Sequence, residues 1–189
     1  MAIEIEAKIK VESLEPIVER LREAGGKFES KLSQRDTYFN NTKSSLTKSG
    51  RGLRLRREVS DDGEKTVLTF KGPKQKGPFK SRQEIEVGLG EDGFSGMVKL
   101  LSGLGFEQVL VFEKRRKVWL LDGCQVCLDE VPLLGNFVEV EGPDENVIAE
   151  VLSKIQLYGL EHINKGYAKL MREKLDEISS DKTEIFFDS

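Results

Sequence analysis

The sequence has almost none of the residues that build a zinc site or a disulfide framework. Its 189 residues include one histidine, His162, and two cysteines, Cys124 and Cys127. A structural zinc ion needs about four such ligands, and a disulfide framework needs several cysteine pairs. The two cysteines have redox spacing, but they stand in a strand pattern without the helix N-terminus that lowers a thiol pKa. We therefore expect ordinary thiols and no structural zinc.

Long apolar runs and an excess of charge of one sign are also missing. No stretch approaches the ~20 apolar residues of a membrane span, and the N-terminus, charged from Glu4, lacks the apolar core of a secretory signal. The 30 Lys and Arg residues against 33 Asp and Glu residues create no global positive field that would attract nucleic acid. We expect a cytoplasmic protein that binds neither membranes nor nucleic acid. The sequence leaves monomer and homodimer open.

Short runs that alternate apolar and polar residues predict eight strands. They cover residues 2–10, 35–39, 52–59, 65–71, 82–87, 109–119, 125–131 and 136–141. Apolar stripes with helical spacing predict a helix from its N-cap Ser13 to Gly25, and two more over 144–158 and 164–175. Together they predict an α+β fold, an antiparallel eight-stranded β-barrel that forms a tunnel with helices packed outside. We expect a single domain over 1–176 and a flexible C-terminal tail over 177–189.

The chain also resembles itself at a distance of eighty residues. This shift superimposes an acidic strand, an amphipathic helix and a terminal glycine on a second set. The matched positions are Glu4 and Glu84, Glu6 and Glu86, Leu14 and Phe94, Ile17 and Met97, Gly25 and Gly105, and Arg35 and Arg115. A strand-helix-strand unit used twice predicts related halves over 1–80 and 81–176 that close one sheet. Two amphipathic segments that share apolar spacing by coincidence are the alternative.

Ionisable side chains occupy one face of strand after strand, while apolar side chains occupy the other. If helices cover the apolar faces, the charges point into the barrel. The acids of this set are Glu4, Glu6, Glu84, Glu86, Asp129, Glu139 and Glu141, and the bases are Lys8, Arg54, Arg56, Lys71, Arg82, Lys114 and Arg116. Solvated outer faces would show the same alternation, but they usually mix signs to gain cross-strand pairs. Here charges of one sign follow each other along a strand, which favours a site.

Carboxylates two residues apart on one strand face repel each other unless a cation lies between them. Glu4 with Glu6, and Glu139 with Glu141, form two such pairs. Oxygen ligands favour hard cations such as Mg²⁺ or Mn²⁺, and Mg²⁺ usually shares its coordination shell with substrate phosphates. With one or two such ions the tunnel becomes net positive and complements a triphosphate. Ion pairs among the acids and bases alone are the other interpretation.

A series of short motifs runs through nearly the whole chain. After Glu4-Ile5-Glu6-Ala7-Lys8, these are residues 36–39, 53–56, 68–73, 81–84, 113–116, 128–131 and 134–141. The series resembles the CYTH superfamily, the triphosphate tunnel metalloenzymes that include class IV (CyaB-type) adenylyl cyclases and thiamine triphosphatases. The first motif matches the ExExK signature of that superfamily. The resemblance implies a barrel whose interior acids bind metal and whose interior bases bind phosphates.

Carried over position by position, the resemblance implies a role for each interior charge. The implied metal ligands are Glu4, Glu6, Asp129, Glu139 and Glu141, and the implied catalytic residues are Lys8, Glu4 and Glu6. The implied phosphate-binding residues are Lys8, Arg54, Arg56, Lys71, Arg82, Lys114 and Arg116. Glu84 either binds metal or pairs with Arg82, and both interpretations stay open.

Three functions fit this site. The first is a Mg²⁺- or Mn²⁺-dependent hydrolase, in which water attacks the terminal phosphorus of ATP, thiamine triphosphate or tripolyphosphate. The second is a class IV adenylyl cyclase, in which the ribose 3′ oxygen of ATP attacks the α-phosphorus. The third is a non-catalytic sensor of a triphosphate or nucleotide. A sensor would not need the complete set of acids, so we expect an enzyme.

Overall fold

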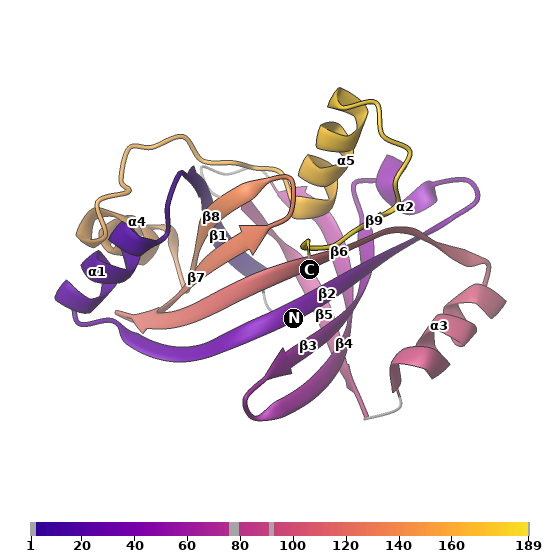
Figure 1. Cartoon of the computed structure of the whole chain (residues 1–189), viewed down its shortest axis with the longest axis horizontal. Helices are drawn as coiled ribbons and strands as arrows, with labels where there is room; N and C mark the ends of the chain where they lie inside the picture. Colours follow the sequence, from indigo (N-terminus) through magenta and orange to yellow (C-terminus); the bar gives the residue numbers. More distant parts are fainter. Residues whose placement is uncertain (1–2, 76–79, 91–92, 189) are drawn as a thin grey trace.

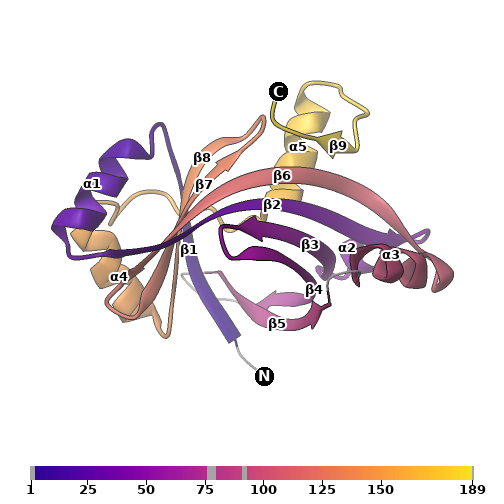
Figure 2. The same ribbon diagram turned by 60° about the horizontal axis from the view of Figure 1, so that its bottom comes forward.

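Eight antiparallel strands close into a barrel, as predicted (Figures 1 and 2). The computed structural model describes residues 3–75, 80–90 and 93–188, with the side chains of residues 3, 4, 75 and 80 left out. The strands are β1 (Ile3–Val11), β2 (Lys27–Asn41), β3 (Gly52–Ser60), β4 (Gly63–Gln75), β5 (Lys80–Leu89), β6 (Phe106–Leu121), β7 (Cys124–Val131) and β8 (Gly135–Gly142). Their order is β2-β3-β4-β5-β1-β8-β7-β6, and β6 pairs back to β2. The ring is therefore closed.

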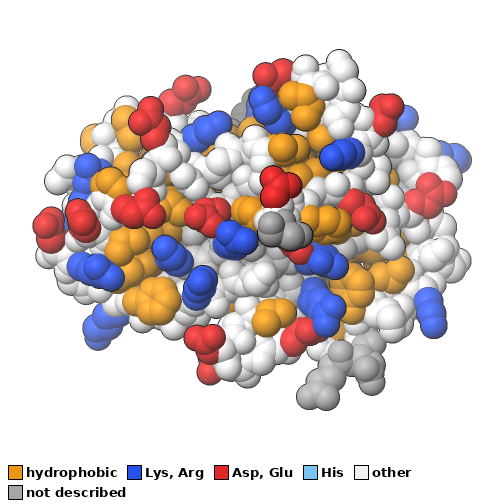
Figure 3. Space-filling view, viewed as in Figure 1, with side chains coloured by type: hydrophobic (Ala, Val, Ile, Leu, Met, Phe, Trp, Pro, Cys, Tyr) orange, Lys and Arg blue, Asp and Glu red, His pale blue; other side chains and the backbone are white. Residues whose placement is uncertain are grey.

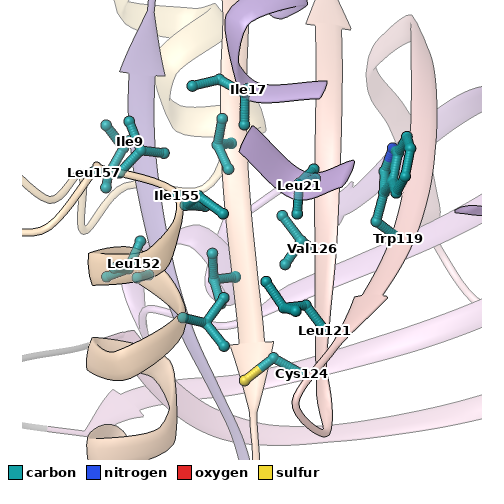
Figure 4. Packing of buried hydrophobic residues seen from close by; sticks show 14 of the residues in the cluster. Ile9, Ile17, Leu21, Trp119, Leu121, Cys124, Val126, Leu152, Ile155 and Leu157 are labelled. Carbon is teal, nitrogen blue, oxygen red and sulfur yellow. The ribbon is translucent and has the colours of Figure 1, made fainter. Parts of the chain in front are cut away.

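Helices cover the outer, apolar faces of the strands. On one side α1 (Glu15–Glu23) and α4 (Glu145–Lys154) pack over β1, β7 and β8 in the largest core cluster (Figure 4). Here Leu21 and Leu152 of the helices meet Ile9 and Val126 of the sheet. On another side α3 (Gly93–Gly103) packs on outward residues of β2 and β3. The apolar side chains of the strands are buried on the outer side of the barrel. The alternate side chains of each strand therefore face the lumen.

Three helical details differ from the sequence prediction. The N-cap of α1 is Leu14 instead of Ser13, and no side chain caps the helix, although Pro16 stands in its first turn. A short helix, α2 (Ser45–Lys48), was not predicted. The last helix, α5 (Tyr167–Glu177), begins later than expected and lies against one end of the barrel. Among the described residues, no helix is both long and apolar enough to cross a membrane.

The two halves of the chain are related by an approximate two-fold arrangement. Exchanging β1–β4 with β5–β8 leaves the strand order around the ring unchanged. Residues eighty apart also face each other at two points, because Ile3 pairs with Gln83 in β1–β5 and Gln34 pairs with Lys114 in β2–β6. A duplication of residues 1–80 as 81–176 would produce this arrangement. The shared origin of the halves remains a prediction.

The C-terminal residues lie along the barrel instead of hanging free. A two-residue strand, β9 (Glu184–Ile185), pairs in parallel with Val111 and Phe112 of β6. Ile185 is buried, and the Phe187 ring lies 4.1 Å from the Arg115 guanidinium. This packing differs from the flexible tail predicted over 177–189. The reason is the free edge of β6 at these positions, because β7 pairs with β6 only from Arg115 onward.

Candidate functional site

A charged cavity of about 610 Å³ occupies the barrel, and every barrel strand contributes to its lining. Of the predicted interior charges, the cavity is lined by Glu6, Lys8, Arg54, Arg56, Lys71, Arg82, Glu84, Glu86, Lys114, Arg116, Glu139 and Glu141. The side chain of Glu4 lies outside the described residues. On the outer face seen in Figure 3, basic and acidic side chains are interspersed. Inside, β4 and β6 present basic side chains and β8 presents acidic ones, whereas β1, β3 and β5 present both signs.

A basic wall lies on β3, β4 and β5. Arg54 is 8% exposed, and its Nη2 donates to Thr69 Oγ1 at 2.9 Å, whereas its buried Nε has no partner among the described residues. Lys71 and Arg82 both bind Glu84, Arg82 through Nε at 2.7 Å. Burial first, then the charges of Arg54 and Arg82, lower the pKa of Lys71 to about 7. The wall therefore holds concentrated positive charge.

Glu84 acts here as the counterion of this wall. Its two carboxylate oxygens are divided between Lys71 and Arg82. Burial opposes ionisation, but these two cations lower the pKa of Glu84 to about 2. Of the two roles left open by the sequence, the geometry favours pairing over metal binding.

An acidic cluster lies on β1 and β8, and β1 is the direct neighbour of β5 in the ring. Glu6 stands directly opposite Glu141 in the β1–β8 ladder, and Lys8 stands opposite Glu139. Lys8 Nζ lies 3.0 Å from Glu139 Oε1 and 3.9 Å from Glu6 Oε1. No described Lys or Arg is within ion-pair distance of Glu141. Burial, followed by the charges of Glu6 and Glu139, raises the pKa of Glu141.

The acidic cluster has donor atoms that suit a hard divalent cation. The donors are carboxylate oxygens, the type that Mg²⁺ and Mn²⁺ prefer, and their mutual repulsion falls when a divalent ion binds. In the described part of the chain, no three acidic, His or Cys side chains are gathered closely enough to hold a metal ion by themselves. Substrate phosphates and Glu4 are the remaining sources of ligands. The residues present therefore fit a shared metal site.

Asp129 lies behind the cavity wall with its carboxylate fully used. It is 0% exposed and receives Arg116 Nε at 2.7 Å, Arg116 Nη2 at 2.6 Å, Lys114 Nζ at 3.1 Å and the Tyr167 hydroxyl at 2.7 Å. Burial raises its pKa, but the charges of Arg116 and Lys114 outweigh that effect and lower it. The resemblance implied a metal ligand. In this structure its carboxylate binds Arg116 and Lys114, which favours a role in positioning these two bases.

A second buried pair, which the sequence did not single out, mirrors this one. Arg56 binds Asp36 through Nε at 2.6 Å and Nη2 at 2.8 Å. Asp36 on β2 and Arg116 on β6 are eighty residues apart and occupy equivalent positions in the two halves. Their cross-strand partners, Arg56 on β3 and Asp129 on β7, correspond to each other in the same way. Acid and base are exchanged between the halves. In each pair the carboxylate fixes the guanidinium and leaves Nη1 without a bond to that carboxylate.

Replacing Asp36 by asparagine is expected to cost about 3 kcal/mol of unfolding free energy at pH 7, because Arg56 stays buried without its carboxylate. Burial favours the neutral acid, but Arg56 and Arg54 hold the pKa of Asp36 well below its usual range. A depressed carboxyl pKa stabilises the fold above the unfolded pKa of about 3.9, and this contribution is lost as pH falls through the folded pKa. Urea unfolding at pH 7 and pH 3 should show a smaller wild-type advantage at pH 3. An equal advantage at both pH values would contradict the assignment.

Known proteins similar to this chain include a domain family, a named relative and solved structures. The model of the CYTH domain family matches residues 2–167. A Methanocaldococcus jannaschii protein provisionally named an adenylate cyclase is 31% identical over 89% of this chain and 98% of its own length. The structure of PH1819 from Pyrococcus horikoshii is 29% identical, with a TM-score of 0.76 over 91% of this chain and 98% of that one.

A plant protein shares the fold at lower identity. HpAC1 from Hippeastrum, provisionally assigned as an adenylyl cyclase, is described as having a dominant triphosphatase activity. It is 20% identical over 94% of this chain and 96% of its own, with a TM-score of 0.66. At this identity the match shows the fold alone.

Proposed function

Because this chain belongs to the CYTH family, we propose that it is a divalent-metal-dependent enzyme that hydrolyses a linear triphosphate inside its barrel. The observation that carries the proposal is the separation of charge across one buried cavity. The acidic cluster lies on β1 and β8, and Arg54, Arg56 and Lys71 lie on β3 and β4, two to four strands away around the ring. A chain of phosphates with bound cations fits between these walls.

The basic side chains bind and orient the phosphates. Arg54, Arg56 and Arg116 present guanidinium groups that are already fixed by carboxylates or hydroxyls, so little side-chain entropy is lost on binding. Lys71 adds a point charge. In the acidic cluster, Glu6, Glu139 and Glu141, together with Glu4, would hold Mg²⁺ or Mn²⁺. A bound divalent ion would supply positive charge to phosphate oxygens and to the attacking water.

The cavity lining favours a short triphosphate without a large organic group. Its described aromatic residues are Tyr38 and Tyr167, and Tyr167 belongs to the apolar cluster at the α5 end. Towards the opposite end the lining includes Glu29, Asp62 and Lys65, which provide no ring on which a nucleobase could stack. Inorganic tripolyphosphate needs no such ring. We therefore propose tripolyphosphate as the preferred substrate, ahead of ATP and thiamine triphosphate.

A second candidate is the cyclisation of ATP to cyclic AMP. It is supported by the name of the relative that is 31% identical. The same acids and bases would hold the phosphates, and the ribose 3′ oxygen would replace water as the nucleophile. The two candidates differ in the pose of the substrate, not in the charged walls.

Incubation with Mg²⁺ or Mn²⁺ and either tripolyphosphate or ATP, followed by separation of the products, tests the proposal. We expect orthophosphate and pyrophosphate from tripolyphosphate, faster than any product from ATP, and no turnover after chelation with EDTA. Cyclic AMP and pyrophosphate from ATP would replace the hydrolase with the cyclase. Tight binding of both compounds without turnover would replace it with a sensor.

A further inference from the structure

The first residues of α5 reach into the charged cavity. Gly166 and Tyr167 line it, and Tyr167 is only 6% exposed. Its ring packs edge-on against Phe137, with ring centroids 5.2 Å apart, in a cluster that includes Phe112. Phe112 and Phe137 lie two residues before Lys114 and Glu139 on the same strand faces. The inner surface thus changes from charged to apolar at this end, and Tyr167 stands at the boundary.

Two lysines of the cavity wall and the carboxylate behind that wall meet at Tyr167. Its hydroxyl donates to Asp129 Oδ2 at 2.7 Å. Lys8 Nζ lies 3.9 Å from the centre of its ring, and Lys114 Nζ lies 4.9 Å from it. The chain just before α5 adds to this contact, because Lys8 Nζ donates to the Lys165 carbonyl at 3.1 Å. Tyr167 therefore contacts Lys8, on the strand of the acidic cluster, and Lys114, one of the predicted phosphate-binding residues.

These contacts do more than fill space. A lysine side chain has many rotamers, and a buried ammonium over an aromatic face is held by the ring quadrupole without being neutralised. Lys8 and Lys114 each have one carboxylate partner as well, Glu139 at 3.0 Å and Asp129 at 3.1 Å, and the ring orients both ammonium groups without adding a further negative charge. The hydroxyl acts through Asp129, which fixes the Arg116 guanidinium, a group that the ring does not contact, in addition to Lys114. The ring and the hydroxyl thus have separable consequences.

We propose that Tyr167 is a positioning residue of the triphosphate site. Its ring fixes the ammonium groups of Lys8 and Lys114 for phosphate binding, and its hydroxyl fixes Arg116 through Asp129. This inference rests on the proposed function of the cavity. It makes α5, which lies outside the barrel wall, part of the substrate-binding structure.

Two substitutions separate the ring from the hydroxyl. Tyr167→Phe keeps the ring, so tripolyphosphate should bind within about threefold of wild type while kcat falls about tenfold, because Arg116 loses its fixed orientation. Tyr167→Leu removes both, so KM and the calorimetric Kd for tripolyphosphate should rise about tenfold or more in addition. The matched control is Leu175→Val, a buried residue of the same helix and cluster. It should lower Tm and leave kcat and KM of the folded enzyme unchanged.

The outcomes distinguish this inference from the proposed function. If the wild type binds and hydrolyses tripolyphosphate but Tyr167→Leu differs from it only in Tm, as Leu175→Val does, Tyr167 merely fills the core and the positioning role is wrong. If the phenylalanine variant fails to recover the binding lost in the leucine variant, the assignment to the ring is wrong. A wild type that neither binds nor hydrolyses any triphosphate would overturn the proposed function and this inference with it.

Discussion

Glu141→Gln is expected to make the metal-free protein more resistant to unfolding and at the same time to abolish metal-dependent turnover. The folded state raises the pKa of Glu141 through burial and through the charges of Glu6 and Glu139. A raised carboxyl pKa means that the ionised form is less stable in the folded than in the unfolded chain, so at pH 7 this charge destabilises the fold. Glutamine removes the charge and keeps the shape. We therefore expect Tm of the metal-free protein to rise.

Metal-dependent turnover of Glu141→Gln should fall, although its Tm rises. Removing one carboxylate from a shared cation site is expected to lower kcat at least ~10²-fold, because charge stabilisation at the reacting phosphate is lost. Thermal unfolding with and without Mg²⁺ gives an independent measure, since bound metal should raise Tm of the wild type more than that of the variant. The matched control is Glu64→Gln, an exposed carboxylate paired with Arg57 on the outer surface, which should change neither quantity. A less stable but fully active Glu141→Gln would remove Glu141 from the cation site.

The barrel could be predicted from the sequence because its strands alternate and its outer faces are covered. Where helices pack, as over β1 and β8, the apolar parity is sharp and the predicted strand agrees with the observed one within two residues. The first half of β2 is different. Residues such as Phe28 and Lys31 are exposed there, and pairing with β6 holds the strand without a buried face. Apart from the edge-on contact of Phe28 with Trp119, at 5.4 Å between ring centroids, this segment has little apolar packing, so a hydrophobic pattern does not predict it.

The direction of the interior side chains could also be predicted, but their partners could not. Strand parity placed Arg116 in the lumen, and the cavity confirms this position. The role of Asp129 depends on Tyr167, which lies 38 residues further along the chain and reaches Asp129 only because α5 packs at the barrel end. Asp36 was missed because its pairing with Arg56 depends on the register between β2 and β3. The alternation in a single sequence predicts which side chains of a strand face the lumen. It does not predict which residues of two neighbouring strands pair.

Asp129→Asn is expected to be the most destabilising single substitution among the charged residues of the barrel. Breaking a buried pair by removing one partner costs about 3–5 kcal/mol, because the remaining charge stays buried without compensation. Asp129 compensates Arg116 and Lys114 together and also accepts the Tyr167 hydroxyl, whereas Asp36 is bound by Arg56. Glu139 still contacts Arg116 in the variant, but Lys114 and the Tyr167 hydroxyl lose this partner too, so the loss should exceed that for Asp36→Asn. Urea unfolding at pH 7 measures both.

The pH dependence and a neighbouring residue separate this effect from a general loss of packing. The pKa of Asp129 is lowered in the folded state, so its contribution is present above the unfolded pKa of about 3.9 and disappears as pH falls through the folded value. The difference between wild type and Asp129→Asn should accordingly shrink in acid. The control is Glu130→Gln at the next position, where the side chain points outward and is exposed beside Arg115, and it should change stability by less than about 0.5 kcal/mol. If Asp129→Asn were equally mild, Arg116 and Lys114 would be held by something other than this carboxylate, and its positioning role would have to be abandoned.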